Sequence, residues 1–219
     1  MRTVLCYGDS LTWGMNALTG ERHHHEDQWP AVLGAELGDG VMVVNAGLNG
    51  RTTMFDDHGV AADRNGVRIL PTILATFEPI DVTVFMLGSN DLKTFISGSA
   101  VAIAQGIKRL VEITRTTVQY GGVPNPGILV VSPPEPLALG PSPSFPLLSP
   151  RTTEWHALAS TLELLCRDLG VAFFDSASVA AAEGGGDGVH LDAANTRAIG
   201  TALAPLVAEL LAQREAKSA

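Results

Sequence analysis

Two short polar segments at opposite ends of the chain carry the side chains of a nucleophilic acyl-transfer site. Ser10 follows a glycine and an aspartate near the N-terminus, and Asp187 and His190 stand three residues apart near the C-terminus. A serine hydroxyl is a weak nucleophile unless a base removes its proton, and histidine suits that task near neutral pH. An aspartate one turn away can accept the other imidazole N–H and fix its tautomer. These residues predict attack by Ser10, with His190 as base and Asp187 as its orienting partner.

Two further polar segments offer hydrogen-bond donors for the oxyanion that such an attack creates. Gly50 follows the second apolar run of the sequence, and Asn90 lies in the segment 88–91 after the third. We expect the backbone N–H groups of Ser10 and Gly50 and the side-chain amide of Asn90 to hold this charge. A glycine at position 50 lets the backbone approach the substrate closely. One such donor is typically worth about 100- to 1000-fold in rate.

Alternating apolar patterns supply the elements that must position these residues. Short runs rich in β-branched and aromatic residues read as buried parallel strands, and segments with apolar spacing near 3.6 read as helices. The alternation predicts an α/β fold with helices on both faces of a parallel sheet. Ligands of such sheets bind at the carboxyl ends of the strands, where the polar segments fall. The expected strands are 4–7, 41–44, 82–87, 128–131 and 171–174, and the expected helices are 29–37, 67–77, 100–120, 152–169 and 193–213.

Composition and charge limit the class of protein and its partners. A chain of 219 residues with 46% hydrophobic and 17% charged residues predicts a single globular domain over 1–219. A formal net charge of −9 argues against nucleic acid or an anionic membrane as partner. The sequence shows no signal-peptide pattern and no apolar run near 20 residues, so we expect a cytoplasmic protein. The two cysteines, Cys6 and Cys166, lie in apolar runs and read as buried free thiols.

Taken in order, the polar segments resemble the four sequence blocks of the GDSL, or SGNH, hydrolase family. Any single block is weak, but the ordered set spans nearly the whole chain and is specific. The resemblance implies a flavodoxin-like three-layer α/β/α sandwich, the SGNH-hydrolase fold, with a five-stranded parallel sheet of order 2-1-3-4-5. It also implies an acyl-enzyme mechanism. The matching blocks are Gly8-Asp9-Ser10-Leu11, Gly50, Gly88-Ser89-Asn90-Asp91 and Asp187-x-x-His190.

The resemblance carries a catalytic triad and an oxyanion hole onto the same residues that the chemistry selects. The implied triad is Ser10, Asp187 and His190, and the implied oxyanion hole is Ser10, Gly50 and Asn90. No metal or organic cofactor is needed for acyl transfer between ester and acceptor. Three consecutive histidines at 23–25 do not share a face, so they read as a solvated loop rather than as metal ligands.

A narrower resemblance points to bacterial arylesterases and acetyl-transferring esterases of this family. It rests on residues 5–14, 50–53, 86–93 and 130–134. This branch implies a small-molecule ester substrate with a short acyl group, most often acetyl, on an aryl alcohol or a sugar. It also implies a homo-oligomer, and it places Trp13 near the substrate. The segments 15–28 and 135–150 follow no pattern of the branch, so substrate choice and oligomer size stay open.

Each of these residues also has a structural interpretation. Ser10 is a good helix N-cap, and Asn90 with its neighbour is a good turn. Asp192 competes with Asp187 for the orienting role or caps the following helix. Trp13 fits a core position as well as a pocket wall. The structural role is the favoured one for Asp9, as a loop-holding carboxylate, and for Arg51, as a structural charge or interface residue.

Three other functions remain open at this stage. A thioesterase or lysophospholipase of the same family would need a long apolar channel. A flavodoxin-like module binding FMN or a phosphate ligand could use backbone donors near Ser10, but it leaves Asp187 and His190 unexplained. A non-catalytic acyl- or sugar-binding relative would not need every triad position to be filled.

Overall fold

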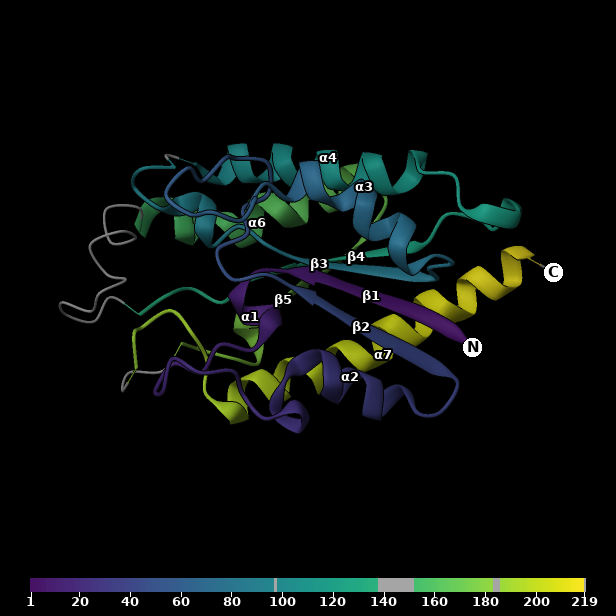
Figure 1. Ribbon diagram of the computed structural model, residues 1–219, viewed down its shortest axis with the longest axis horizontal. Coiled ribbons are helices and arrows are strands. Elements are labelled where there is room, and N and C mark those ends of the chain that lie inside the picture. The colour runs from purple at the N-terminus through teal and green to yellow at the C-terminus, as the bar shows by residue number, and fades with distance from the viewer. Residues whose placement is uncertain (97, 138–151, 183–185, 219) are drawn as a thin grey trace.

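A computed structural model describes residues 1–96, 98–137, 152–182 and 186–218, which form a parallel sheet between two layers of helices (Figure 1). The five strands lie in the order β2-β1-β3-β4-β5, and every neighbouring pair is parallel. The predicted α/β class, the three layers and the strand order are therefore confirmed. The strands are β1 (Arg2–Gly8), β2 (Val41–Gly47), β3 (Val82–Met86), β4 (Gly127–Ser132) and β5 (Ala172–Asp175).

The helices correspond to the predicted segments, with shifted ends. The helix predicted for 100–120 stops at Thr116, because Thr117 has an extended conformation with φ −74° and ψ 114°, which a right-handed helix cannot contain. The strand predicted for 82–87 stops at Met86, before Gly88 at φ 130°. The longer helices are α2 (Trp29–Leu37), α3 (Gly66–Phe77), α4 (Ala100–Thr116), α6 (Thr152–Leu169) and α7 (Ala193–Ser218).

The core consists of two apolar layers, one on each face of the sheet. Helices α3, α4 and α6 cover one face, and α2 and α7 cover the other (Figure 1). Ile103 and Leu158 are buried in the first layer, and Trp29 and Leu203 in the second. The central strands β1 and β3 are buried on both faces, which explains their continuous apolar sequences. Cys6 and Cys166 are buried free cysteines, as expected.

The single turn of helix α1 (Ser10–Trp13) begins directly after β1. Asp9 caps this helix, since its carboxylate accepts a hydrogen bond from the backbone N–H of Leu11, and Gly14 ends it in a left-handed conformation. The backbone of α1 packs against Gly47 at the end of β2, where no side chain intervenes. The close contact fixes the direction in which Ser10 leaves the sheet.

Two expectations from the sequence can be compared with the structure only within the residues that it describes. Most of the irregular segment 135–150 lies outside the described residues, so its predicted role stays a prediction. Among the residues that the structure describes, no helix is both long and apolar enough to cross a membrane.

We predict that Gly47→Ala destabilises the protein by more than about 2 kcal/mol, because the new methyl group would lie 2.6 Å from the Cα atom of Trp13. Gly34→Ala is the matched control: its methyl group meets Val43 at 3.4 Å and lies inside α2, so the free energy of unfolding should hold or rise by up to about 1 kcal/mol. Urea denaturation measures both. Equal effects of the two substitutions would contradict the tight contact at Gly47.

Candidate active site

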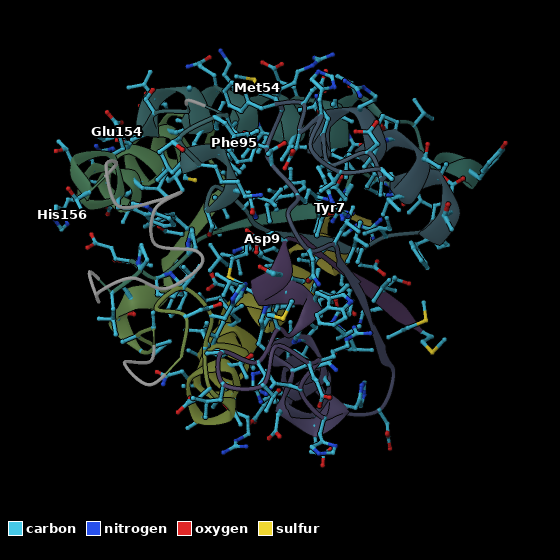
Figure 2. All side chains as sticks on the ribbon, turned by 60° about the vertical axis from the view of Figure 1, so that its left-hand side comes forward. Tyr7, Asp9, Met54, Phe95, Glu154 and His156 are labelled. Atoms are coloured by element: carbon cyan, nitrogen blue, oxygen red, sulfur yellow. The ribbon has the colours of Figure 1, made fainter. Side chains whose placement is uncertain are left out.

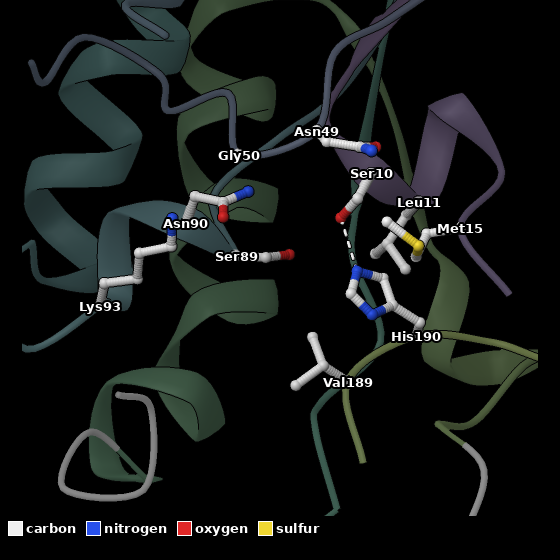
Figure 3. A pocket seen from close by; sticks show the side chains of 10 residues that line it. All are labelled: Ser10, Leu11, Met15, Asn49, Gly50, Ser89, Asn90, Lys93, Val189 and His190. Atoms are coloured by element: carbon white, nitrogen blue, oxygen red, sulfur yellow. Dashed lines mark hydrogen bonds between the residues drawn. The ribbon is translucent and has the colours of Figure 1, made fainter. Parts of the chain in front are cut away.

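The polar segments predicted to share an edge of the sheet meet in one pocket of about 200 Å³ (Figure 3). Ser10 follows β1, Gly50 follows β2, Asn90 follows β3, and His190 lies on the segment between β5 and α7. The carboxyl ends of parallel strands point the same way, so segments far apart in sequence converge there. The pocket is lined by Ser10, Leu11, Met15, Asn49, Gly50, Ser89, Asn90, Lys93, Val189 and His190.

Ser10, His190 and Asp187 form a continuous chain of hydrogen bonds. The Oγ of Ser10 lies 2.8 Å from Nε2 of His190, and Nδ1 of His190 lies 2.5 Å from Oδ2 of Asp187. The other carboxylate oxygen of Asp187 accepts the backbone N–H groups of Val189 and His190, each at 2.9 Å. Asp187 therefore holds both the backbone and the ring of His190. With Nδ1–H donated to Asp187, Nε2 is left to accept the hydroxyl proton of Ser10.

The carboxylate of Asp187 is strongly biased towards its charged form. Partial burial opposes ionisation, but the hydrogen bonds from the ring and backbone of His190, together with that from Val189, outweigh it and lower the pKa of Asp187 to about 2. Asp187 is thus ionised throughout the range in which a serine esterase works. A fixed negative charge beside His190 stabilises the imidazolium that forms when the ring takes up a proton.

Gly50 and Asn90, which are predicted to donate hydrogen bonds to an oxyanion, line the same pocket as Ser10. Gly50 has a φ angle of 83°, a conformation that side-chain-bearing residues rarely adopt, so the glycine is required by the turn itself. The side-chain amide of Asn90 donates to the Oδ2 of Asp9 at 3.3 Å and to the backbone carbonyl of Arg51 at 3.2 Å. Both bonds are long, and together they fix the orientation of the amide at the pocket wall (Figure 3).

Arg51 is a buried structural charge, as the sequence interpretation favoured. Its Nη1 donates to the carbonyl of Gly8 at 2.8 Å and to that of Ala46 at 2.5 Å, so one guanidinium joins the ends of β1 and β2. The guanidinium lies 4.0 Å from the centre of the Tyr7 ring, a cation–π contact. Because the carbonyl of the same residue accepts from Asn90, Arg51 links the loop of Gly50 to the amide donor.

Two buried carboxyl groups lie beneath the site and bind its loops from inside. Figure 2 shows Asp9 with Tyr7 in the interior, whereas His156 lies at the periphery. Burial raises the pKa of Asp9 to about 6, against the opposing effect of the Leu11 N–H. Burial likewise raises the pKa of Asp91 to about 7, although Asp91 accepts hydrogen bonds from the backbone N–H and the hydroxyl of Thr53.

Sequence reasoning did not find the part that Asp91 and Arg51 play in holding the loop that carries Gly50. The sequence shows that Asp91 is an acidic residue beside Asn90. It does not show the partner of this carboxylate, because Thr53 lies 38 positions away. Such a contact depends on how β2 and β3 are arranged in the sheet. No local pattern reveals it.

Contacts bear on two competing assignments, those of Asp192 and Trp13, and they decide the first. Asp192 accepts the backbone N–H of Asn195 at 2.7 Å, which is an N-cap of α7, so its role is structural. Trp13 is absent from the ten residues that line the pocket, and the guanidinium of Arg22 lies 5.0 Å from the centre of its ring. Contact of Trp13 with a substrate stays a prediction.

A serine–histidine–aspartate chain beside a glycine turn and an asparagine amide, at the carboxyl edge of a parallel sheet, is the arrangement of a serine hydrolase. Comparisons with known proteins agree. A family model described as "GDSL-like Lipase/Acylhydrolase family" matches residues 6–198. The chain belongs to this family, and it is an ester hydrolase. The interpretation as a flavodoxin-like binding module is thereby set aside.

Solved structures of esterases are similar to this chain over its whole length. A carbohydrate acetylesterase family member from Sinorhizobium meliloti is 46% identical, with a TM-score of 0.93 over 97% of this chain and 100% of that one. An aryl esterase from M. smegmatis is 39% identical, with a TM-score of 0.88 over 96% and 100%. A second carbohydrate acetylesterase from Sinorhizobium meliloti is 36% identical, with a TM-score of 0.88 over the same shares. None of the curated proteins compared with the chain matches it.

The raised pKa of Asp9 predicts a pH dependence of stability. The folded state keeps a proton on Asp9 up to about pH 6, whereas the unfolded chain has lost it above about pH 4. The contribution of Asp9 to the free energy of unfolding therefore falls as pH rises from about 4 through 6. Urea denaturation between pH 4 and 7 should show a smaller decline in the free energy of unfolding of Asp9→Asn than in that of the wild type. Identical declines in the two proteins would show that Asp9 carries no such proton.

Proposed function

We propose that the protein hydrolyses esters of short acyl groups, acetyl above all, through an acyl-enzyme formed on Ser10. The observation that carries the proposal is the unbroken hydrogen-bonded chain from Asp187 through His190 to Ser10, which ends inside a pocket. The substrate is a small-molecule ester of an aryl alcohol or a sugar. Similarity to carbohydrate acetylesterases and to an aryl esterase supports this choice.

In the acylation half of the reaction, Oγ of Ser10 attacks the ester carbonyl carbon while its proton passes to Nε2 of His190. The oxyanion accepts hydrogen bonds from the backbone N–H groups of Ser10 and Gly50 and from the amide of Asn90. To donate to it, Asn90 exchanges one of its two long internal bonds. His190 then gives the proton to the departing alkoxide oxygen, so that the alcohol leaves and the acyl group stays on Ser10.

In the second half, a water molecule or another alcohol takes the place of the departed alcohol. His190 removes its proton, the oxygen attacks the acyl carbon, and the same donors hold the second oxyanion. When this second tetrahedral intermediate collapses, His190 returns the proton to Ser10, and the acid or a new ester is released. Asp187 remains ionised throughout, because its pKa lies near 2.

The size of the pocket supports a short acyl group over the long chain of a thioesterase or lysophospholipase substrate. At about 200 Å³ the pocket is below the 300–1,000 Å³ typical of sites that enclose larger ligands. Its apolar lining of Leu11, Met15 and Val189 suits a methyl or ethyl group. The homo-oligomer and the cytoplasmic location inferred from sequence remain part of this proposal.

Labelling with a fluorophosphonate, followed by peptide mapping, tests the nucleophile. We expect the adduct on Ser10, and we expect Ser10→Ala to lower kcat for p-nitrophenyl acetate by a factor of 10³ or more with its fold intact by circular dichroism. A second serine or no adduct in an active preparation, or activity retained in Ser10→Ala, would defeat the assignment.

A series of p-nitrophenyl esters from two to twelve carbons tests the acyl group. The value of kcat/KM should be highest at two to four carbons and fall beyond, because longer chains do not fit the pocket. Highest turnover at eight carbons or more would replace the acetyl-ester proposal with a thioesterase or lysophospholipase function.

A further inference from the structure

Ser89 places an unused hydroxyl group at the wall of the catalytic pocket. The residue is 6% exposed and lies between Gly88 and Asn90. Its Oγ has no hydrogen-bond partner among the residues that the structure describes. Figure 3 shows this hydroxyl directed into the pocket, between the side chains of Asn90 and His190. Neither the proton relay nor the set of oxyanion donors makes use of it.

An unpartnered buried hydroxyl costs stability and calls for a reason. Leaving such a group without a hydrogen bond costs about 1–3 kcal/mol, and native proteins hold few of them. Thr83 has a similar hydroxyl, but it lies on β3, outside the pocket. Ser89 differs because a ligand in the pocket can supply the missing partner.

Two further polar residues, Asn49 and Lys93, line the same pocket. The Oδ1 of Asn49 is also buried without a partner. The ammonium group of Lys93 lies 3.4 Å from a carboxylate oxygen of Asp57, which leaves donors for a ligand. The apolar residues Leu11, Met15 and Val189 line the same pocket. The pocket thus offers apolar contacts for a methyl group as well as polar groups for a hydroxyl.

We propose that Ser89 is a specificity-determining residue that hydrogen-bonds a free hydroxyl group on the alcohol portion of the substrate. The inference rests on the proposed function. An acetyl group has no hydrogen-bonding atom except its carbonyl oxygen, which the oxyanion donors take, so the partner of Ser89 belongs to the alcohol. The favoured substrates are partially acylated polyols, in which a free hydroxyl lies near the ester. An alcohol without that hydroxyl leaves Ser89 unpaired and is disfavoured.

A matched pair of esters tests the inference: the monoacetate of trans-1,2-cyclohexanediol, and cyclohexyl acetate, which lacks only the free hydroxyl. The wild-type protein should prefer the diol monoacetate in kcat/KM. In Ser89→Ala that preference should fall about tenfold, as expected for the loss of one hydrogen bond of about 1.4 kcal/mol. The melting temperature of Ser89→Ala should hold or rise, because an unpaired buried hydroxyl has been removed.

Thr83→Val is the control, since it removes an unpartnered buried hydroxyl that does not face the pocket. Its preference between the two esters should equal that of the wild type. An unchanged preference in Ser89→Ala, or an equal loss on both esters, overturns the assignment of Ser89 while the proposed function stands. Failure of the wild-type protein to hydrolyse p-nitrophenyl acetate and both of these esters overturns the proposed function itself.

Discussion

The geometry of the site depends on the contacts that the guanidinium of Arg51 makes. Parallel strands end with carbonyl groups that have no strand partner, and the site lies where β1 and β2 end. Arg51 satisfies the carbonyls of Gly8 and Ala46 with one nitrogen, and its cation is buried against Tyr7. A lysine would lack the planar guanidinium that lies over the Tyr7 ring. The loop that carries Gly50 is therefore held to the sheet beside the helix that carries Ser10.

The same cation offsets part of the cost of burying one acidic group, Asp9, close to the reacting atoms. Asp9 and Asp91 lie in the interior, where burial penalises their charge and raises both pKa values. Arg51 attracts the charged form of Asp9 and partly offsets that penalty. These carboxyl groups fix the positions of their neighbours. Asp9 caps α1 and contacts the amide of Asn90, and Asp91 holds Thr53. Buried polar groups thus bind the segments of Ser10, Gly50 and Asn90 from inside.

Most of the fold, and the residues that form the hydrogen-bonded chain from Asp187 to Ser10, could be predicted from sequence for physical reasons. Buried parallel strands require continuous apolar runs, so each strand appears in the sequence near its true place. Ser10 and His190 could be paired because an activated hydroxyl needs a base. Arg51 and Asp91 could be named but not given partners, since their contacts lie across strands. Ser89 gave no local signal, because an unpartnered hydroxyl is visible only once every neighbour is placed.

The contact between Ser10 and His190 joins positions 180 residues apart, nearly the two extremes of the chain. Such a long-range contact forms only after the intervening strands have taken their order, and it is among the entropically costliest closures in the fold. On a ribosome, the proposed nucleophile emerges 180 residues before its proposed base. The growing chain therefore carries an unactivated Ser10 until the segment of His190 has been made, and the proposed ester cleavage begins only when the two segments have met. Activity at this site would thus report a folded sheet.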